Sequence, residues 1–222
     1  MHLSLLQRTY ELAASAKVVT PPNPAVGCVL VDDSGVVVGE GHTQPVGGPH
    51  AEIMALRDAQ AKGHATANAT AYVTLEPCSH HGRTGPCCDA LIAAGIKRVV
   101  ATHTDPNPLV SGQGFARLRA AGVQVDVPPP DAPVAVQARE LNIGFFSRMV
   151  RKRPWVRAKM ASSLDGKTAL TNGASQWITS PAARADGHLW RARSCAVLTG
   201  IGTILADNPR LDVREVTTSR QP

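Results

Sequence analysis

Hydrophobic and polar positions follow two different periods in the first part of the chain. Apolar residues at helical spacing predict an opening helix over 1–17. The short β-branched runs 25–31 and 36–41 are joined by Asp-Asp-Ser-Gly, a combination typical of a β-hairpin. Between helix and hairpin, the prolines of Thr-Pro-Pro-Asn-Pro favour an extended turn. The chain therefore opens with one helix and two antiparallel strands.

After the hairpin, helical and strand-like patterns alternate. We expect helices over 50–63, 87–95 and 114–122, and strands over 71–78, 98–102 and 123–127. Glycines at the ends of the first two of these helices are suitable stop signals. A hairpin followed by helices that alternate with buried strands predicts an α/β fold, in which helices cover both faces of the sheet in a three-layer sandwich.

The strongest break in the pattern is the proline-rich run 127–133. A helix with a basic tail is expected over 134–154, and the composition changes from Trp155 onward. We place the domain boundary between these features, with a first domain over 1–146 and a second over 147–222. The second portion is short for an independent α/β domain.

Within the second portion, the pattern predicts one helix and one strand. Ser180 is suited to cap the helix, and Pro181 fits its first turn. The run Cys-Ala-Val-Leu-Thr-Gly at 195–200 is expected to form the strand.

Charge and composition narrow the partners. A net charge of +6 favours an anionic partner, while only 4% aromatic residues weighs against nucleic acid, so a phosphorylated small molecule is preferred. The chain has no apolar run long enough for a membrane span, and Arg8 and Glu11 interrupt any signal-peptide core. Five cysteines, two of them adjacent, make a poor disulfide framework, so we expect a cytoplasmic protein. Self-association into a homo-oligomer stays open.

A metal motif is the most informative chemical feature. His50 and Glu52 form His-x-Glu at the start of a predicted helix, and Pro77 and Cys78 form Pro-Cys at the end of a predicted strand. Zinc deaminases combine His-x-Glu with Pro-Cys-x-x-Cys, and use the glutamate as a proton shuttle rather than a ligand. A catalytic zinc needs three protein ligands and an open position for water, whose pKa it lowers to about 7. The pattern predicts a zinc-dependent deaminase.

The spacing leaves three candidates for the third ligand. The literal motif requires a cysteine at 81, where this chain has a histidine, so His81, Cys87 and Cys88 are the candidates. Cys87 is favoured because a Gly- and Pro-containing loop can return it to the metal at a helix N-terminus, which stabilises a thiolate. Cys88 would point about 100° away from it, into the core. A closed structural zinc, with four ligands from 78–88, is the alternative.

Long strings of this sequence resemble the bifunctional deaminase/reductase family of riboflavin biosynthesis, RibD. The strings TPPNPAVGCVLV, GGPHAEIMAL, YVTLEPCSHHGRTGPCCDALI and DPNPLVSGQG are similar to its deaminase domain, and KMASSLDGKTAL, SQWITSPAAR and ILADNPRLDVR to the first part of its reductase domain. The resemblance implies a three-layer, cytidine-deaminase-like zinc domain, followed by the first part of a dihydrofolate-reductase-like α/β domain.

For the deaminase half, the resemblance implies His50, Cys78 and Cys87 as zinc ligands and Glu52 as proton shuttle. The implied reaction is the hydrolytic deamination of a diaminopyrimidinone that carries a ribosylamino group with a 5′-phosphate, which yields the corresponding aminouracil. Four further residues are expected in the substrate pocket: Asn23, His42, Asp105 and Asn107. Three residues of the ligand loop are candidates for reaching the phosphate: His80, His81 and Arg83.

For the reductase half, the resemblance implies reduction of the ribosyl group to ribityl by NADPH. It places NADP contacts at Ala161, Trp177, Thr203 and Asp207, and substrate contacts at Ser175, Arg191, Leu211 and Arg214, with Lys159 and Asp165 as further candidates. The later glycine-rich segment that cradles the dinucleotide phosphates is not in this sequence. We therefore expect deaminase activity, and no reductase turnover by this chain alone.

Three alternatives remain open. One is a deaminase of another base, such as guanine, cytosine or tRNA adenosine. The second is a zinc-stabilised binding module without turnover. In the third, the reductase portion serves only as a dimerisation surface.

Overall fold

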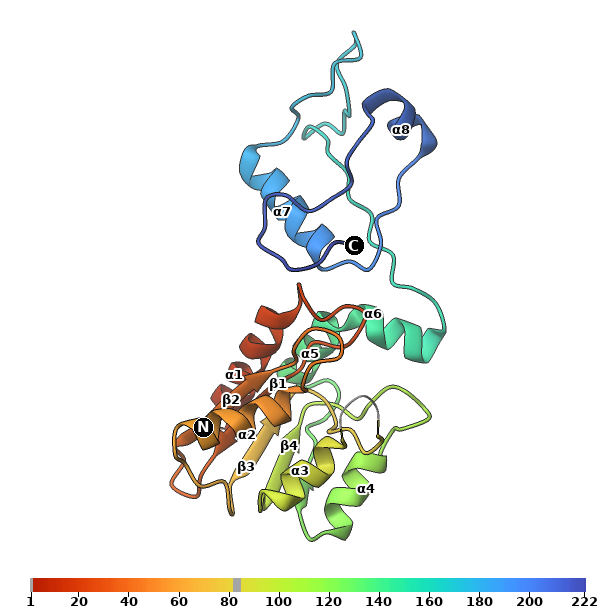
Figure 1. Cartoon of the computed structure of the whole chain (residues 1–222). Coiled ribbons are helices and arrows are strands. Elements are labelled where there is room, and N and C mark those ends of the chain that lie inside the picture. Colours follow the sequence, from red (N-terminus) through yellow and green to blue (C-terminus); the bar gives the residue numbers. More distant parts are fainter. Residues whose placement is uncertain (1, 82–84) are drawn as a thin grey trace. The chain divides into compact units, whose positions relative to one another are not determined.

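The computed structural model describes residues 2–81 and 85–222, which form two compact units, Met1–Trp155 and Val156–Pro222 (Figure 1). The units divide a few residues after the expected boundary at 146. Helix α6 (Ile143–Phe146) continues directly into a π-helical turn over Ser147–Arg151, so the chain does not leave the first unit at 146. The buried Ser147 hydroxyl also donates to the carbonyl of Arg153 at 2.9 Å.

A five-stranded sheet forms the centre of the first unit, in the order β2-β1-β3-β4-β5. The strands are β1 (Gly27–Val31), β2 (Val37–His42), β3 (Thr70–Val73), β4 (Arg98–Ala101) and β5 (Gln124–Asp126). The predicted hairpin is present as the antiparallel pair β1–β2, and β3 also pairs antiparallel with β1. The β3–β4 and β4–β5 pairs are parallel, as crossover helices require.

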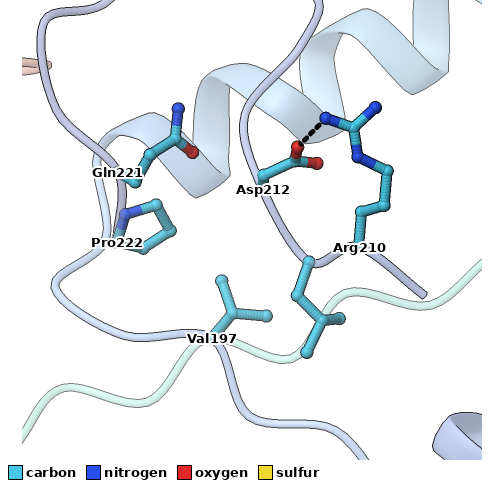
Figure 2. Close-up of a pocket in the computed structure, with 6 residues that line it drawn as sticks. Val197, Arg210, Asp212, Gln221 and Pro222 are labelled. Atoms are coloured by element: carbon cyan, nitrogen blue, oxygen red, sulfur yellow. Dashed lines mark ion pairs between the residues drawn. The ribbon is translucent and has the colours of Figure 1, made fainter. Parts of the chain in front are cut away.

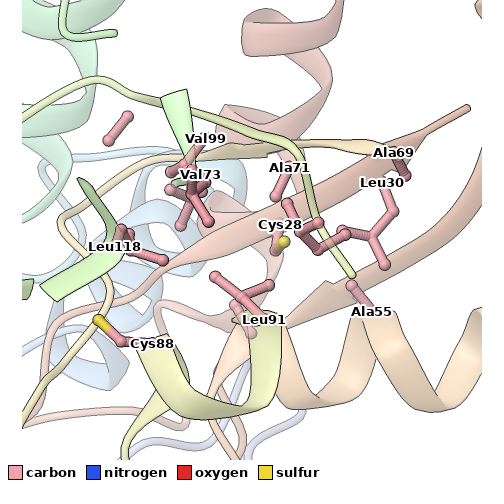
Figure 3. Close-up of a cluster of buried hydrophobic side chains, with 14 of the residues drawn as sticks. Cys28, Leu30, Ala55, Ala69, Ala71, Val73, Cys88, Leu91, Val99 and Leu118 are labelled. Carbon is pink, nitrogen blue, oxygen red and sulfur yellow. The ribbon is translucent and has the colours of Figure 1, made fainter. Parts of the chain in front are cut away.

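Helices cover both faces of this sheet. Along β1, Cys28 and Leu30 belong to one buried cluster, shown in Figure 3. Val29 and Val31 belong to another, because side chains alternate between the faces of a strand. The first cluster packs under α2 (Ala51–Ala61), α3 (Cys87–Ala93) and α4 (Gln113–Ala120). The second packs against α1 (His2–Ala16) and α5 (Pro133–Leu141). The predicted three-layer α/β fold is confirmed.

Two glycines let α2 lie directly on β2. A Cβ atom added at Gly39 would lie 2.3 Å from the carbonyl oxygen of Ala55, and one at Gly41 would lie 2.4 Å from the amide nitrogen of Ala55. Both distances are far below van der Waals contact, so only glycine allows this approach. The start of α2, which follows His50 immediately, is thereby fixed against the sheet.

The long helix expected over 134–154 is broken at Asn142. Helix α5 ends at Leu141, and the fully buried Asn142 side chain forms two hydrogen bonds of 2.8 Å, one to the amide and one to the carbonyl of Ala25. This pair of bonds joins the α5–α6 junction to the segment that enters β1. Sequence periodicity alone gives no sign of a contact between residues so far apart.

The second unit contains helices α7 (Pro181–Ala192) and α8 (Ile201–Asp207). Ser180 caps α7 as predicted, since its hydroxyl accepts from the amide of Ala183 at 3.2 Å, and Pro181 is the first helical residue. The strand predicted at 195–200 is wrong. All of 156–222 is described and none of it is a strand, because 195–200 has no neighbouring strand to pair with. No helix in the described part of the chain is long and apolar enough to cross a membrane.

Candidate metal centre

Three side chains from separate parts of the first unit meet at one point. His50 is the residue immediately before α2, Cys78 follows β3 in a loop, and Cys87 is the first residue of α3. One possible ligand atom from each lies within 4.8 Å of the others. Among the described residues, this is the group of His, Cys, Asp and Glu side chains placed to hold a metal ion.

The distances fit zinc. The Nδ1 atom of His50 lies 3.5 Å from the sulfur of Cys78 and 3.4 Å from that of Cys87. Tetrahedral zinc, with Zn–S bonds of about 2.3 Å and Zn–N bonds of about 2.0 Å, separates nitrogen from sulfur by about 3.5 Å. One imidazole and two thiols also form a donor set that leaves a fourth position open, as a catalytic zinc requires.

The surroundings of Cys78 favour a thiolate, the form that binds metal. The hydrogen bond from the Cys87 thiol, and then that from His50, lower the pKa of Cys78 to about 4. The backbone amide of Cys87 also donates to the Cys78 sulfur, at 3.3 Å. The hydrogen bond to Cys78, and then burial, raise the pKa of the Cys87 thiol. The hydrogen bond to Cys78 raises the pKa of His50.

Glu52 lies in the first turn of α2, two residues after the histidine, and is only 3% exposed. Burial, followed by the negative charge of Cys78, raises the pKa of its carboxyl group to about 6. A carboxyl group with a pKa near neutrality can both accept and return a proton under physiological conditions. Glu52 therefore has the protonation behaviour of an acid–base group and is not part of the ligand cluster.

The structure favours Cys87 as the third ligand. Cys88 is fully buried in the core, as expected for a side chain about 100° around the helix from Cys87 (Figure 3). Its thiol donates to the carbonyl of Pro77 at 3.1 Å. His81 is exposed and is not in the cluster. His80 is exposed as well, and Arg83 lies outside the described residues.

The four residues expected in the substrate pocket have different environments. Asn23 lies in the turn before β1, and His42 ends β2 with its Nδ1 atom 3.2 Å from the carbonyl of Thr43. Asp105 is half-buried, and burial raises the pKa of its carboxyl group. It accepts a hydrogen bond from the amide of Asn107, whose own side-chain oxygen accepts from Leu109. Asn107 is thus a turn residue, and its side-chain NH2 group is a donor by chemistry.

A further polar residue, Glu76, was missed by sequence reasoning. It lies two residues before Cys78 and is 5% exposed. Its carboxylate accepts hydrogen bonds from four backbone amides. The available signal was a glutamate directly before the Pro-Cys motif, at the end of a buried strand.

The structure brings together part of the predicted reductase set. Arg191 donates to the carbonyl of Asp212 at 2.8 Å, and Arg214 forms an ion pair with the same residue. Leu211 lines a small pocket beside Asp212, shown with its neighbours Val197, Arg210, Gln221 and Pro222 in Figure 2. These three predicted substrate residues therefore gather at one place.

The remaining reductase candidates are dispersed. Thr203 and Asp207 lie one turn apart in α8, and Ala161 lies outside the helices. Trp177 is 71% exposed and stacks with the guanidinium group of Arg184 at 4.3 Å. Three further candidates, all exposed, lie in loop segments: Lys159, Asp165 and Ser175.

Fold and site together define the class of protein. A mixed sheet between two helical layers, with His-x-Glu and two cysteines converging at strand and helix ends, is the arrangement of a zinc-dependent deaminase domain. Residues 1–103 match the family model for the cytidine and deoxycytidylate deaminase zinc-binding region, and 154–222 match the RibD C-terminal domain.

The particular relatives are RibD proteins. The chain is 54% identical to the riboflavin biosynthesis protein RibD of Escherichia coli, over 94% of this chain and 55% of that protein. It resembles a solved structure of Acinetobacter baumannii RibD with 49% identity and a TM-score of 0.86, over 95% of this chain and 57% of the other. A Thermotoga maritima deaminase/reductase structure gives 42% identity and a TM-score of 0.87, over 99% and 60%.

These comparisons confirm the resemblance found in the sequence. Over nearly its whole length, the chain is homologous to the RibD proteins of riboflavin biosynthesis. It spans about half the length of the curated relatives that it matches.

Proposed function

We propose that this chain is a zinc-dependent aminohydrolase of riboflavin biosynthesis. Its substrate would be the diaminopyrimidinone that carries a phosphoribosylamino group, and its product the aminouracil. The observation that carries the proposal is the cluster of His50, Cys78 and Cys87 at zinc-ligand distances, with the buried carboxyl group of Glu52 two residues from the histidine. The relatives named above supply the substrate class.

Zinc at this position supplies a water acidic enough to attack at neutral pH. The protein residues then have separate tasks. Glu52 would accept a proton from the attacking water while a C–O bond forms at the ring carbon that bears the exocyclic amine. The same carboxyl group returns the proton to the nitrogen as the C–N bond breaks and ammonia leaves. A pKa of about 6 suits both transfers, because the group is neither a very weak base nor a very weak acid at neutral pH.

The pocket residues would recognise the heterocycle. In this proposal, the side-chain amides of Asn23 and Asn107, the ring of His42 and the carboxylate of Asp105 offer donors and acceptors to a polar pyrimidine. The net charge of +6 favours a phosphorylated substrate. Cysteines that are all free suit a reducing compartment such as the cytoplasm.

For residues 154–222 we propose the start of an NADPH-dependent reductase site. The match to the RibD C-terminal domain and the gathering of Arg191, Leu211 and Arg214 around Asp212 support this assignment. Each of the two guanidinium groups contacts Asp212, and arginine is a residue type suited to binding phosphate. Titration of the tryptophan fluorescence of the chain, which includes Trp177, with NADPH would test cofactor binding, and a signal unchanged at saturating NADPH would contradict it.

The decisive experiment measures ammonia release by the zinc-loaded chain. We expect release from the phosphoribosylamino-diaminopyrimidinone, and none from guanine, cytosine or tRNA. The Glu52→Gln variant should keep its zinc and lose about 10²–10⁴-fold in rate, the usual contribution of acid–base catalysis. Release stimulated by tRNA, with none from the diaminopyrimidinone, would favour a deaminase of another base. No release from any of these substrates, together with stoichiometric zinc, would favour a binding module.

A further inference from the structure

Glu76 holds an unusual concentration of hydrogen bonds for one buried carboxylate. Its Oε2 atom accepts from the amides of Asp105 at 2.8 Å and Gly112 at 3.0 Å. Its Oε1 atom accepts from the amides of Gly114 at 2.8 Å and Phe115 at 3.2 Å. All four donors belong to the segment between β4 and the first turn of α4. The side chain thus gathers both ends of the loop 105–112 onto one group.

Part of this arrangement replaces a missing helix cap. Helix α4 begins after Gly112, which has no side chain to accept hydrogen bonds from the first turn. The amides of Gly114 and Phe115 occupy the positions that an N-cap side chain normally satisfies. Glu76 satisfies them from a distant part of the sequence. Its negative charge is also favourable at a helix N-terminus.

Residues 76–78, which contain Glu76 and the ligand Cys78, are also held by contacts with α3. The amide of Cys88 donates to the carbonyl of Cys78 at 3.1 Å, and the Cys88 thiol donates to the carbonyl of Pro77. A Cβ atom added at Gly114 would lie 2.1 Å from that same carbonyl, so α4 rests directly on Pro77. Residues 76–78 are therefore held between the N-termini of two helices.

From these contacts we infer that Glu76 is a positioning residue, which fixes the position of the loop 105–112 relative to the metal ligand Cys78. This role rests on the proposed deaminase function, since the loop contains Asp105 and Asn107 of the proposed pocket. Metal and pocket are then fixed to each other through one side chain. A displacement of about 1 Å at a reacting centre can cost about 100-fold in rate, so such registration matters for turnover.

The test variant is Glu76→Gln. Glutamine keeps the shape of the side chain, but it has one acceptor oxygen and an NH2 group that would face backbone N–H donors. We expect the zinc content to stay at the wild-type level and the visible spectrum of the cobalt-substituted protein to be unchanged. The KM for the phosphoribosylamino-diaminopyrimidinone should rise at least about tenfold, more than kcat falls. Glu76→Asp, which retains the charge on a shorter side chain, should recover part of the loss.

Thr9→Val is the matched control for loss of a buried polar contact. Thr9 is fully buried in α1, where its hydroxyl donates to the carbonyl of Leu6. We expect this variant to be less stable and to keep the wild-type KM. A wild-type KM in Glu76→Gln would overturn the inference. Loss of zinc from Glu76→Gln would overturn it too, because the residue would then be supporting the ligand and not the loop.

Hydrogen exchange tests the anchoring independently of any substrate. In the wild-type protein, the amides of Asp105, Gly112, Gly114 and Phe115 should be protected, and Glu76→Gln should lose protection at these positions while β1 keeps it. Unprotected amides at 105 and 112 in the wild type would refute the anchoring, even if the variants fail to fold. Protected amides in a protein that releases no ammonia would leave the anchoring in place and refute only the proposed function.

Discussion

The buried carboxyl group of Glu52 should make the metal-free protein less stable than it could be. Its pKa is about 6 in the folded chain, against an ordinary value of 4.5, because burial disfavours the charged form. Folding therefore favours the protonated group. As pH rises from 4.5 through 6, ionisation in the folded state becomes an increasing cost, which is fully developed above about pH 7.

Replacement by glutamine removes this cost. A difference of about 1.5 pKa units corresponds to about 2 kcal/mol. The Glu52→Gln variant should thus exceed the wild type in free energy of unfolding by about 2 kcal/mol at pH 8, and by less than about 1 kcal/mol at pH 5, where the unfolded chain is only partly ionised. The same substitution abolishes the proposed acid–base step, so stability and activity should change in opposite directions.

The assay is urea unfolding, followed by circular dichroism, of both proteins after metal removal with a chelator under reducing conditions. The difference between the two proteins at each pH cancels the titration of all other groups that the substitution leaves unchanged. A gain that is the same at pH 5 and pH 8 would refute the electrostatic reasoning. So would a variant that is less stable than the wild type at pH 8.

Three further predictions concern the third zinc ligand, the hydrogen bonds of Asn142 and the packing of α2 on β2. Cys87→Ser should weaken zinc binding by more than the roughly 10–100-fold that is typical of a change outside the ligand set. The adjacent Cys88→Ser variant should keep full zinc. Competition with a chromogenic chelator measures both affinities, and equal effects would contradict the ligand assignment. Asn142→Leu should lower the free energy of unfolding, measured with urea, by about 2–6 kcal/mol, because the buried amide and carbonyl of Ala25 lose their partners. A loss under about 1 kcal/mol would show that these two groups find other partners. Gly41→Ala should destabilise the fold by about 1–3 kcal/mol and weaken zinc binding, because the added methyl group displaces α2. Gly144→Ala, where the methyl group would enter open space, is the control. An unchanged zinc affinity in Gly41→Ala would show that the position of α2 does not determine that of His50.

Much of the fold could be predicted because local patterns agree with tertiary packing. The alternation of helices and strands predicts a three-layer sandwich, and the structure has two buried clusters to match, with Cys28 and Leu30 on one face of β1 and Val29 and Val31 on the other. The strand expected over 71–78 ends at 73 in the structure. At Thr74 the backbone amide still donates to the carbonyl of Gly27, but the amide of Gly27 donates to the Thr74 hydroxyl in place of a backbone carbonyl. Such replacement depends on a distant partner and leaves no periodic signal.

The candidate site could be predicted in part. The spacing of His50 and Glu52 and the Pro-Cys pair indicated a metal, but spacing alone left His81, Cys87 and Cys88 as alternatives. The structure distinguishes the two cysteines by the direction of each side chain at the start of α3, with Cys87 toward His50 and Cys88 into the core, while His81 is exposed and outside the cluster. The anchoring role of Glu76 could not be foreseen, because its four donors lie 29 to 39 residues further along the chain.

X-ray absorption at the zinc edge of the reconstituted chain tests the central assignment most directly. We expect one zinc per chain with two sulfur neighbours at about 2.3 Å and nitrogen or oxygen neighbours at about 2.0 Å. Three or four sulfur neighbours, or a folded chain that retains no divalent metal, would contradict it.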